Sequence, residues 1–510
     1  MSSPGLALLG RQMSMHAKPA RGLESAALSP LSQGRFGRIF RRLPAAKYGA
    51  NDAASEANLK KLAVAMVAKA EDPKDGFDAE ESGVPALYTY FGQFIDHDLT
   101  FDPVSSLQHQ NDPNALVDFR TPAFDLDCVY GRGPNDQPYM YDGNELIAGT
   151  VQVSGGTGGT VDLPRASNGR AIIGDPRNDE NTIVSQLQGL LLRFHNRTAR
   201  QMAGAAFEDI QRQVRFHYQY VVLNDFLSRI VHSSVLQELK SNGHWDFHKL
   251  KLFKWKHDPF MPVEFAAACY RFGHSMVRPD YRLNDDDATL QKIFPAFTGF
   301  QPMASGRGID WGRFIDVDLR TSSESKPADT KRRLQFAYRI DTSVVNPLGN
   351  LPPVIVDSMP SLAERNLKRG FRLGLPSGQC VARAMGIAPL RDDQIIIGKA
   401  VDKPEEGDVV GPITDDKVGG SVFAGNCPLW TYILAEAAIY KEKETIPVKE
   451  TGKTIQTPKL GPVGGRIVAE VFLGLMFGDA NSMLRLDPGW HPAAGANYRL
   501  KDFVNFALGK

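Results

Sequence analysis

The chain has 510 residues, of which 42% are hydrophobic and 23% are charged, and its formal net charge is +1. This composition is typical of a globular protein with a large buried core, and the balanced charge excludes a strong field for nucleic acid or acidic lipid. No uninterrupted apolar run is long enough to span a bilayer, so no transmembrane segment is predicted.

The amino terminus carries one short apolar run, residues 5–10, with no basic region before it. We therefore expect no conventional signal peptide, and either a cytoplasmic protein or one exported without a leader. Residues 1–75 are expected to form an extension and residues 76–510 one large domain. Within the extension, a cluster of arginines and aromatic residues at 35–42 could hold an anionic partner or lie on the domain as a solvated arm. The four cysteines show no C-x-x-C spacing, which predicts neither a zinc site nor a disulfide framework.

Residues 85–99 are expected to form a helix that begins at Pro85. On this helix Gln93, Asp96 and His97 project from one face, whereas Asp98 is rotated about 100° from His97. A lone histidine in an apolar helix is usually a satisfied core residue. Here four polar groups share one short apolar segment, and burying them without partners is costly, so the pattern favours a functional site.

A loop follows at residues 120–131, with oxygen-bearing groups at alternate positions. The side chains of Thr121, Asp125 and Asp127, with the carbonyl of Ala123, can face one cation. Calcium takes six to eight such oxygen ligands. An isolated Asp-x-Asp loop is more often a turn with solvated carboxylates.

Three later segments carry polar residues of interest. Arg177 and Glu180 precede a helix over residues 183–194, where such a pair usually forms a cap and a surface ion pair. His274 follows the helical pattern of residues 265–269, and an apolar helix can present a histidine to haem iron, although a core histidine would look the same. Asn366 and Arg369 share one face of a helix. His195 receives no role. Residues 430–440 and 465–477 are predicted amphipathic helices, joined by a surface connection at 441–459.

These five motifs, in this order, resemble the animal-type haem peroxidases of the peroxidase–cyclooxygenase superfamily, in a leaderless form such as bacterial members have. The resemblance implies a mainly α-helical domain with few short strands, a haem b cofactor and a bound calcium ion. In it, His97 matches the distal histidine, Arg177 the catalytic arginine and His274 the axial ligand of the haem iron.

The other residues take their roles from the same resemblance. Asn366 would accept the proton of the second His274 nitrogen, and Arg369 would lie near a haem propionate. Asp96 and Glu180 match the two positions that form esters with haem methyl groups, whereas Asn181 stands where a methionine would form a third link, which is excluded. The implied calcium ligands are Asp98, Thr121, Ala123, Asp125 and Asp127.

The activity implied is reduction of hydrogen peroxide to form a ferryl intermediate, which oxidises a halide, thiocyanate or small phenolic donors. Gln93 would hold distal water and line the entry of the anion. Two alternatives remain. A fatty-acid dioxygenase of the superfamily has a radical tyrosine three residues before the axial histidine, where this chain has Arg271. A haem- and calcium-binding scaffold for adhesion should have lost the distal histidine or the arginine.

Overall fold

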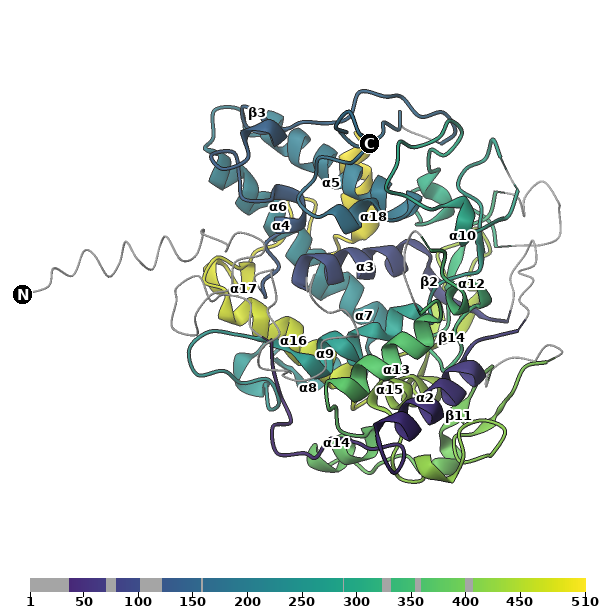
Figure 1. The fold of residues 1–510 in the computed structure, drawn as a ribbon. Helices are drawn as coiled ribbons and strands as arrows, with labels where there is room; N and C mark the ends of the chain where they lie inside the picture. Colours follow the sequence, from purple (N-terminus) through teal and green to yellow (C-terminus); the bar gives the residue numbers. More distant parts are fainter. Residues whose placement is uncertain are drawn as a thin grey trace, which may run out of the picture.

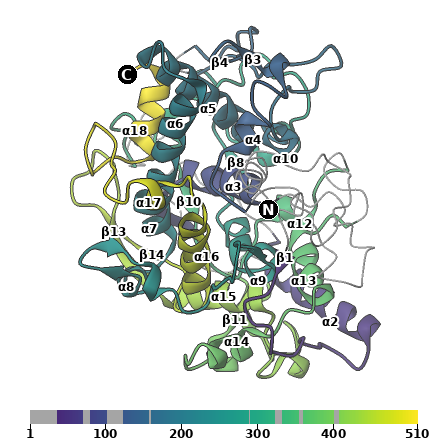
Figure 2. The same cartoon turned by 90° about the vertical axis from the view of Figure 1, so that its left-hand side faces the viewer.

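Helix α3 (Leu87–Leu99) lies at the centre of the molecule, between two groups of helices (Figure 1). On one side lie α5 (Thr182–Gln201), α6 (Phe207–Val221) and α18 (Leu500–Leu508). On the other side lie α9 (Val263–Ala267), α13 (Leu362–Arg372), α15 (Leu429–Ile439) and α16 (Gly464–Gly478), and Figure 2 shows the same division from a second direction. The predicted distal helix is therefore the element on which both halves of the core pack.

The computed structural model describes residues 36–69, 79–100, 122–156, 159–287, 289–322, 332–353, 359–399 and 407–510. Within these ranges the remaining α-helices are α2 (Asp52–Met66), α4 (Asp127–Tyr130), α7 (Leu227–Ile230), α8 (Ser233–Glu238), α10 (Ile293–Ala296), α12 (Asn346–Gly349), α14 (Gly378–Ala384) and α17 (Met483–Leu486). Short 3-10 helices are η1 (Pro138–Met140), η2 (Pro176–Asp179), η4 (Phe247–Lys249), η5 (Cys269–His274), η6 (Trp311–Arg313), η7 (Asp392–Gln394) and η8 (Ser421–Phe423), and a π-helical turn, η3 (Val222–Phe226), joins α6 to α7.

Strands in the described ranges form two-stranded pairs. Two pairs join segments far apart in sequence: β1 (Phe36–Gly37) runs parallel to β7 (Met261–Pro262), and β2 (Glu81–Pro85) antiparallel to β10 (Phe336–Tyr338). The others are β3 (Tyr141–Asp142) with β4 (Glu145–Leu146), β5 (Lys240–Ser241) with β6 (His244–Trp245), β8 (Asp280–Tyr281) with β9 (Gln291–Lys292), β11 (Ile396–Ile397) with β12 (Gly411–Pro412), and β13 (Lys441–Thr445) with β14 (Thr454–Pro458). The predicted mainly α-helical fold with few short strands is confirmed.

The start of α3 differs slightly from the expected Pro85. Pro85 ends β2, and the backbone N–H of Ala86 donates to the carbonyl of Gln335 at 2.9 Å, so the helix begins at Leu87. At its other end, Thr100 closes the helix through its N–H and its hydroxyl, which both donate to the carbonyl of Asp96. Its beginning is thus set by a strand from elsewhere in the chain.

Two sequence expectations need correction. The described part of the expected extension packs on the domain, because α2 contacts α13 and buries Leu59, Leu62 and Met66 completely in the core. The supposed surface connection at 441–459 is the β13–β14 hairpin, which packs on β2 and encloses Lys459 completely. In both cases the tertiary contacts that decide the structure come from distant segments.

Candidate functional site

His97, the predicted distal histidine, is buried on α3 and hydrogen-bonded to a residue that the sequence did not single out. Its Nδ1 lies 2.7 Å from Oδ1 of Asn178, while Nδ2 of Asn178 donates to Oε1 of Gln188 at 2.8 Å. Because the Asn178 oxygen faces the ring, Nδ1 of His97 carries the hydrogen and Nε2 keeps its lone pair. Burial and the neighbouring Arg177 charge lower the pKa of His97 to about 4, so the ring is neutral at physiological pH and can accept a proton at Nε2.

Arg177 lies on η2 and joins this turn to the end of α3. Its Nη2 donates to the carbonyl oxygens of His97 at 3.0 Å and Thr100 at 2.5 Å, and pairs with the buried Asp175 carboxylate at 2.8 Å. Asp175 also accepts the backbone N–H of Arg177, as the N-cap of η2. Arg177 is therefore held beside His97 by a carboxylate two residues before it in sequence.

Glu180 and Gln93 meet on the same side of α3 as His97. The amide of Gln93 donates to Oε1 of Glu180, and that oxygen lies 4.0 Å from Nε2 of His97. Burial raises the pKa of Glu180 to about 7, with Arg177 acting against it. Asn181 caps α5 by accepting the N–H groups of Ile183 and Val184, which explains why the helix starts directly after this carboxylate.

The second histidine, His274, lies at the end of η5. We expected one continuous α-helix here, but the backbone breaks at Ala268 (φ −136°, ψ −68°) and continues as a 3-10 turn. Nδ1 of His274 lies 2.7 Å from Nδ2 of Asn366 on α13, so the predicted partner is in place, but its amide nitrogen and not its oxygen faces the ring. Burial, followed by the Arg271 charge, lowers the pKa of His274 to about 3, which keeps the ring neutral.

Arg271 and Tyr270 show how η5 faces α3. In a 3-10 helix residues i and i+3 lie on one side, so Arg271 and His274 share a face. The guanidinium of Arg271 pairs with Asp96 at 3.1 Å, and it lowers the pKa of that carboxyl against the opposing effect of burial. The hydroxyl of Tyr270 instead donates to the carbonyl of Gly92 at 3.2 Å. Asp96 thus gains a cationic partner that sequence spacing did not predict.

The expected cation loop brings three carboxylates together. Ligand oxygens of Asp98, Asp125 and Asp127 all lie within 4.8 Å of one another. Between the last two, Leu126 has a left-handed backbone (φ +58°), a strained conformation of the kind found at ligand sites. Thr121 lies outside the described residues, and Ala123 lies in the loop beside the carboxylates.

The surroundings fix this loop in place. Arg215 and Gln219 of α6 donate to the carbonyls of Asp125 and Phe124 at 2.7 and 2.9 Å. Gly174 packs so closely that a Cβ there would lie 2.5 Å from the carbonyl oxygen of Asp127. The loop that carries Asp125 and Asp127 therefore packs directly against the segment that leads to Arg177.

Comparison with known proteins agrees with this geometry. Residues 107–307 match the family model for animal haem peroxidases, a range that includes Arg177, Glu180 and His274. This segment of the chain is similar to the animal haem peroxidase family, and the match covers about two fifths of the chain. The chain is 24% identical over 225 residues to peroxinectin A of Dictyostelium discoideum, an alignment that covers 43% of this chain and 38% of that protein. The match thus spans about two fifths of the length of that relative.

Two solved structures have a similar fold. Peroxidase A of Dictyostelium discoideum superposes with a TM-score of 0.57 at 16% identity, covering 92% of this chain and 94% of the other. A fatty acid alpha-dioxygenase of Arabidopsis thaliana gives a TM-score of 0.54 at 15% identity, covering 93% and 77%. The fold shared with these two structures therefore extends over nearly the whole chain, including the segments with His97 and Asn366.

The family implies a haem cofactor, and the site residues fit one. A Cβ built on Gly273, next to His274, would meet no atom within 4 Å, so the backbone there borders open space. The side chains of Arg177, Glu180 and Arg271 stay between 22 and 27% exposed although they lie in the interior. Two neutral histidines, each fixed by an amide, complete a donor set suited to haem iron and its bound peroxide.

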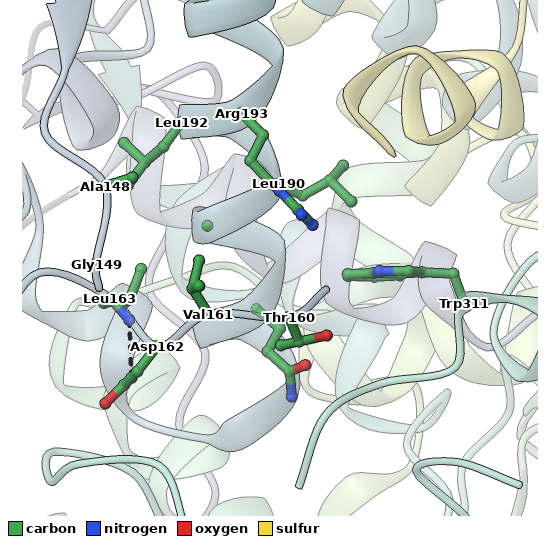
Figure 3. Close-up of a pocket in the computed structure, with 12 residues that line it drawn as sticks. Ala148, Gly149, Thr160, Val161, Asp162, Leu163, Leu190, Leu192, Arg193 and Trp311 are labelled. Atoms are coloured by element: carbon green, nitrogen blue, oxygen red, sulfur yellow. Dashed lines mark hydrogen bonds between the residues drawn. The ribbon is translucent and has the colours of Figure 1, made fainter. Parts of the chain in front are cut away.

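A separate cavity, away from the two histidines, is too small to be an alternative substrate site. It measures about 20 Å³ and lies between α5, the segment 160–163 and Trp311 (Figure 3). Figure 3 shows Leu190 and Arg193 of α5 on one side of it and the ring of Trp311 on the other. This volume holds about one water molecule, too little for an organic donor.

Other expectations are met. His195 is a satisfied core histidine, bonded to the Tyr130 hydroxyl and the Asn144 carbonyl. All four cysteines are free thiols. Among the helices described, none is long and apolar enough to cross a membrane.

Proposed function

We propose that this protein is a haem peroxidase that reduces hydrogen peroxide and oxidises a halide, thiocyanate or a small phenolic donor. The observation that carries the proposal is the orientation of His97. The side-chain oxygen of Asn178 accepts a hydrogen bond from Nδ1 of His97, which leaves Nε2 as an acceptor beside Arg177 and Glu180. His274, hydrogen-bonded to Asn366, would hold the haem iron from η5.

Haem supplies an iron that binds peroxide and stores its two oxidising equivalents. The residues of this chain do the proton chemistry. His97 accepts a proton at Nε2 from one peroxide oxygen and returns it to the other, so that water leaves. Arg177 stabilises the negative charge that develops as the O–O bond breaks. Gln93, bonded to Glu180, orients distal water and lines the entry of the anion. Arg369, on the Asn366 face of α13, binds a propionate.

Calcium binding is the second part of the proposal. Asp98, Asp125 and Asp127 supply carboxylate oxygens, and Thr121 and the carbonyl of Ala123 complete the shell. Because Asp98 follows His97 directly and Gly174 packs on the same loop, the ion connects the two segments that carry the distal residues.

Asp96 and Glu180 are proposed to form esters with haem methyl groups. Each ester removes one hydrogen from a methyl group and one from a carboxyl group, and hydrogen peroxide takes up both as it becomes two waters. Their positions support this role, because Glu180 lies 4.0 Å from Nε2 of His97 and Asp96 pairs with Arg271, which shares a face of η5 with His274. After peroxide treatment, haem should stay with the denatured chain, and Asp96→Asn with Glu180→Gln should release it. Free haem from the treated parent protein would contradict the esters.

The decisive test of the activity is a rapid-mixing spectrum of haem-loaded protein with hydrogen peroxide. The Soret band should bleach and return on addition of iodide or thiocyanate, whereas a His97→Leu variant should bind haem and fail to respond. A parent spectrum insensitive to peroxide would favour a scaffold. A response discharged only by a fatty acid would favour a dioxygenase, against which stands Arg271, paired with Asp96 in place of a radical tyrosine.

A further inference from the structure

A cluster of enclosed arginines lies beneath the first turn of α3. The Arg313 cluster comprises Arg282, Arg313, Arg320 and Arg333, which are all buried. Arg313 on η6 is completely enclosed, and its carbonyl accepts the N–H of Gln335 at 2.8 Å. The carbonyl of Gln335 accepts the N–H of Ala86, the residue before α3. Two hydrogen bonds through Gln335 thus connect the cluster to the residue before α3.

The carboxylates of the cluster are shared between arginines. Asp285 contacts Nη2 of Arg313 at 2.6 Å and Nη1 of Arg320 at 3.2 Å. Glu81 likewise pairs with both Arg278 and Arg333. Arg320 also pairs with Asp310 at 2.8 Å and with Asp318 at 2.9 Å, so Asp285 is not its only partner.

Arg313 keeps donors that these carboxylates do not satisfy. Its Nε and Nη1 atoms are buried and make no hydrogen bond within the structure described. A buried cationic donor without a partner costs several kcal/mol, so such groups normally hold a ligand or a water. Burial, followed by the charges of Arg313 and Arg333, lowers the pKa of Arg282 to about 10, so these neighbouring arginines repel its charge.

We propose that Nε and Nη1 of Arg313 bind a small inorganic anion of halide size beneath the start of α3. The enclosure of Arg313 limits the size of the ligand, and its weakly hydrated guanidinium suits a buried anion. A water molecule would satisfy the donors but leave the repulsion between neighbouring arginines. The site is independent of the haem and calcium sites and of the proposed peroxidase activity, and its occupant stabilises the segment from which α3 starts.

Crystals of the full chain soaked in sodium bromide test the location. An anomalous bromine peak within hydrogen-bonding distance of Arg313 Nε and Nη1 is expected. A water molecule at that position, or an empty one, would overturn the proposal.

Thermal unfolding tests the site in solution. The midpoint should rise saturably with sodium chloride when sodium gluconate keeps the ionic strength constant. Arg313→Met should lose the saturable rise, whereas the matched surface variant Arg200→Met, at a side chain 68% exposed, should keep it. Asp285→Asn removes the competing carboxylate and should shift saturation to lower chloride, which keeps the test valid if Arg313→Met does not fold. A peak in the crystal with no saturable effect in solution would mean binding at crystal concentration only and would also overturn the proposal.

Discussion

Replacing Asn178 with alanine removes the acceptor behind His97. Asn178 is completely buried and is hydrogen-bonded to His97 at 2.7 Å and to Gln188 at 2.8 Å. Because these groups are buried, water does not replace either bond when Asn178 is removed. Leaving a buried donor unsatisfied costs about 1–3 kcal/mol. The ring can escape this cost by moving its hydrogen to Nε2, where it blocks proton transfer from peroxide. Loss of comparable supporting residues reduces activity about 10–100-fold, and we expect a decrease of that size in the bimolecular rate with hydrogen peroxide.

The assay is stopped-flow bleaching of the Soret band against peroxide concentration. Haem binding should be unchanged, because His274 and Asn366 are untouched. Asn178→Asp is the matched control, because aspartate retains an acceptor for His97. The Gln188 amide can turn so that its Nε2, which has no partner in the structure described, donates to the new carboxylate. Alanine and aspartate variants that slow equally, or an alanine variant that reacts at the parental rate, would refute the assigned tautomer.

Three further outcomes follow from other parts of the structure. Chelation of calcium, or the substitution Asp125→Asn, should lower the midpoint of thermal unfolding, whereas Asp136→Asn, at an exposed carboxylate, should not. Calorimetry measures these midpoints. Equal midpoints with and without chelator would contradict the calcium proposal. Burial raises the pKa of Glu436 from 4.5 to about 7. The folded protein then holds a proton that the unfolded chain loses, so stability should fall by roughly 3 kcal/mol as pH rises through this interval, and denaturant titrations of Glu436→Gln should show a flatter profile. Leu62→Ala, in the buried face of α2, should lower the free energy of unfolding by about 2–5 kcal/mol in the same titration. A decrease of less than about 1 kcal/mol would mean that α2 is a peripheral arm and not part of the core.

The local character of the active segments could be predicted from the sequence. The run around His97 combines apolar residues with four polar groups, and its helical spacing places Gln93 and His97 on one side, where the structure has both beside Glu180. Asp125 and Asp127 alternate along a loop, and the structure brings them together with Asp98. In each case neighbouring residues in the chain determine the pattern.

Pairings between distant segments could not be predicted in this way. Asn178 is 81 residues from His97, and nothing in its surroundings distinguishes it from a capping residue. The break at Ala268 makes η5 a 3-10 turn, and this irregularity directs Arg271 to Asp96 and Tyr270 to the α3 backbone. The Arg313 cluster likewise assembles from separate loops that look like ordinary charged surface in sequence.

The sequence by itself therefore determined which chemical groups the site has and which helix carries the distal histidine, because side-chain spacing along a helix is a local property. Only the tertiary structure decided which tautomer His97 adopts, which cation faces Asp96 and which buried donors of Arg313 lack a hydrogen-bond partner among the described residues. Those properties depend on hydrogen-bond partners and on exclusion of water, and both arise when segments far apart in the chain pack together.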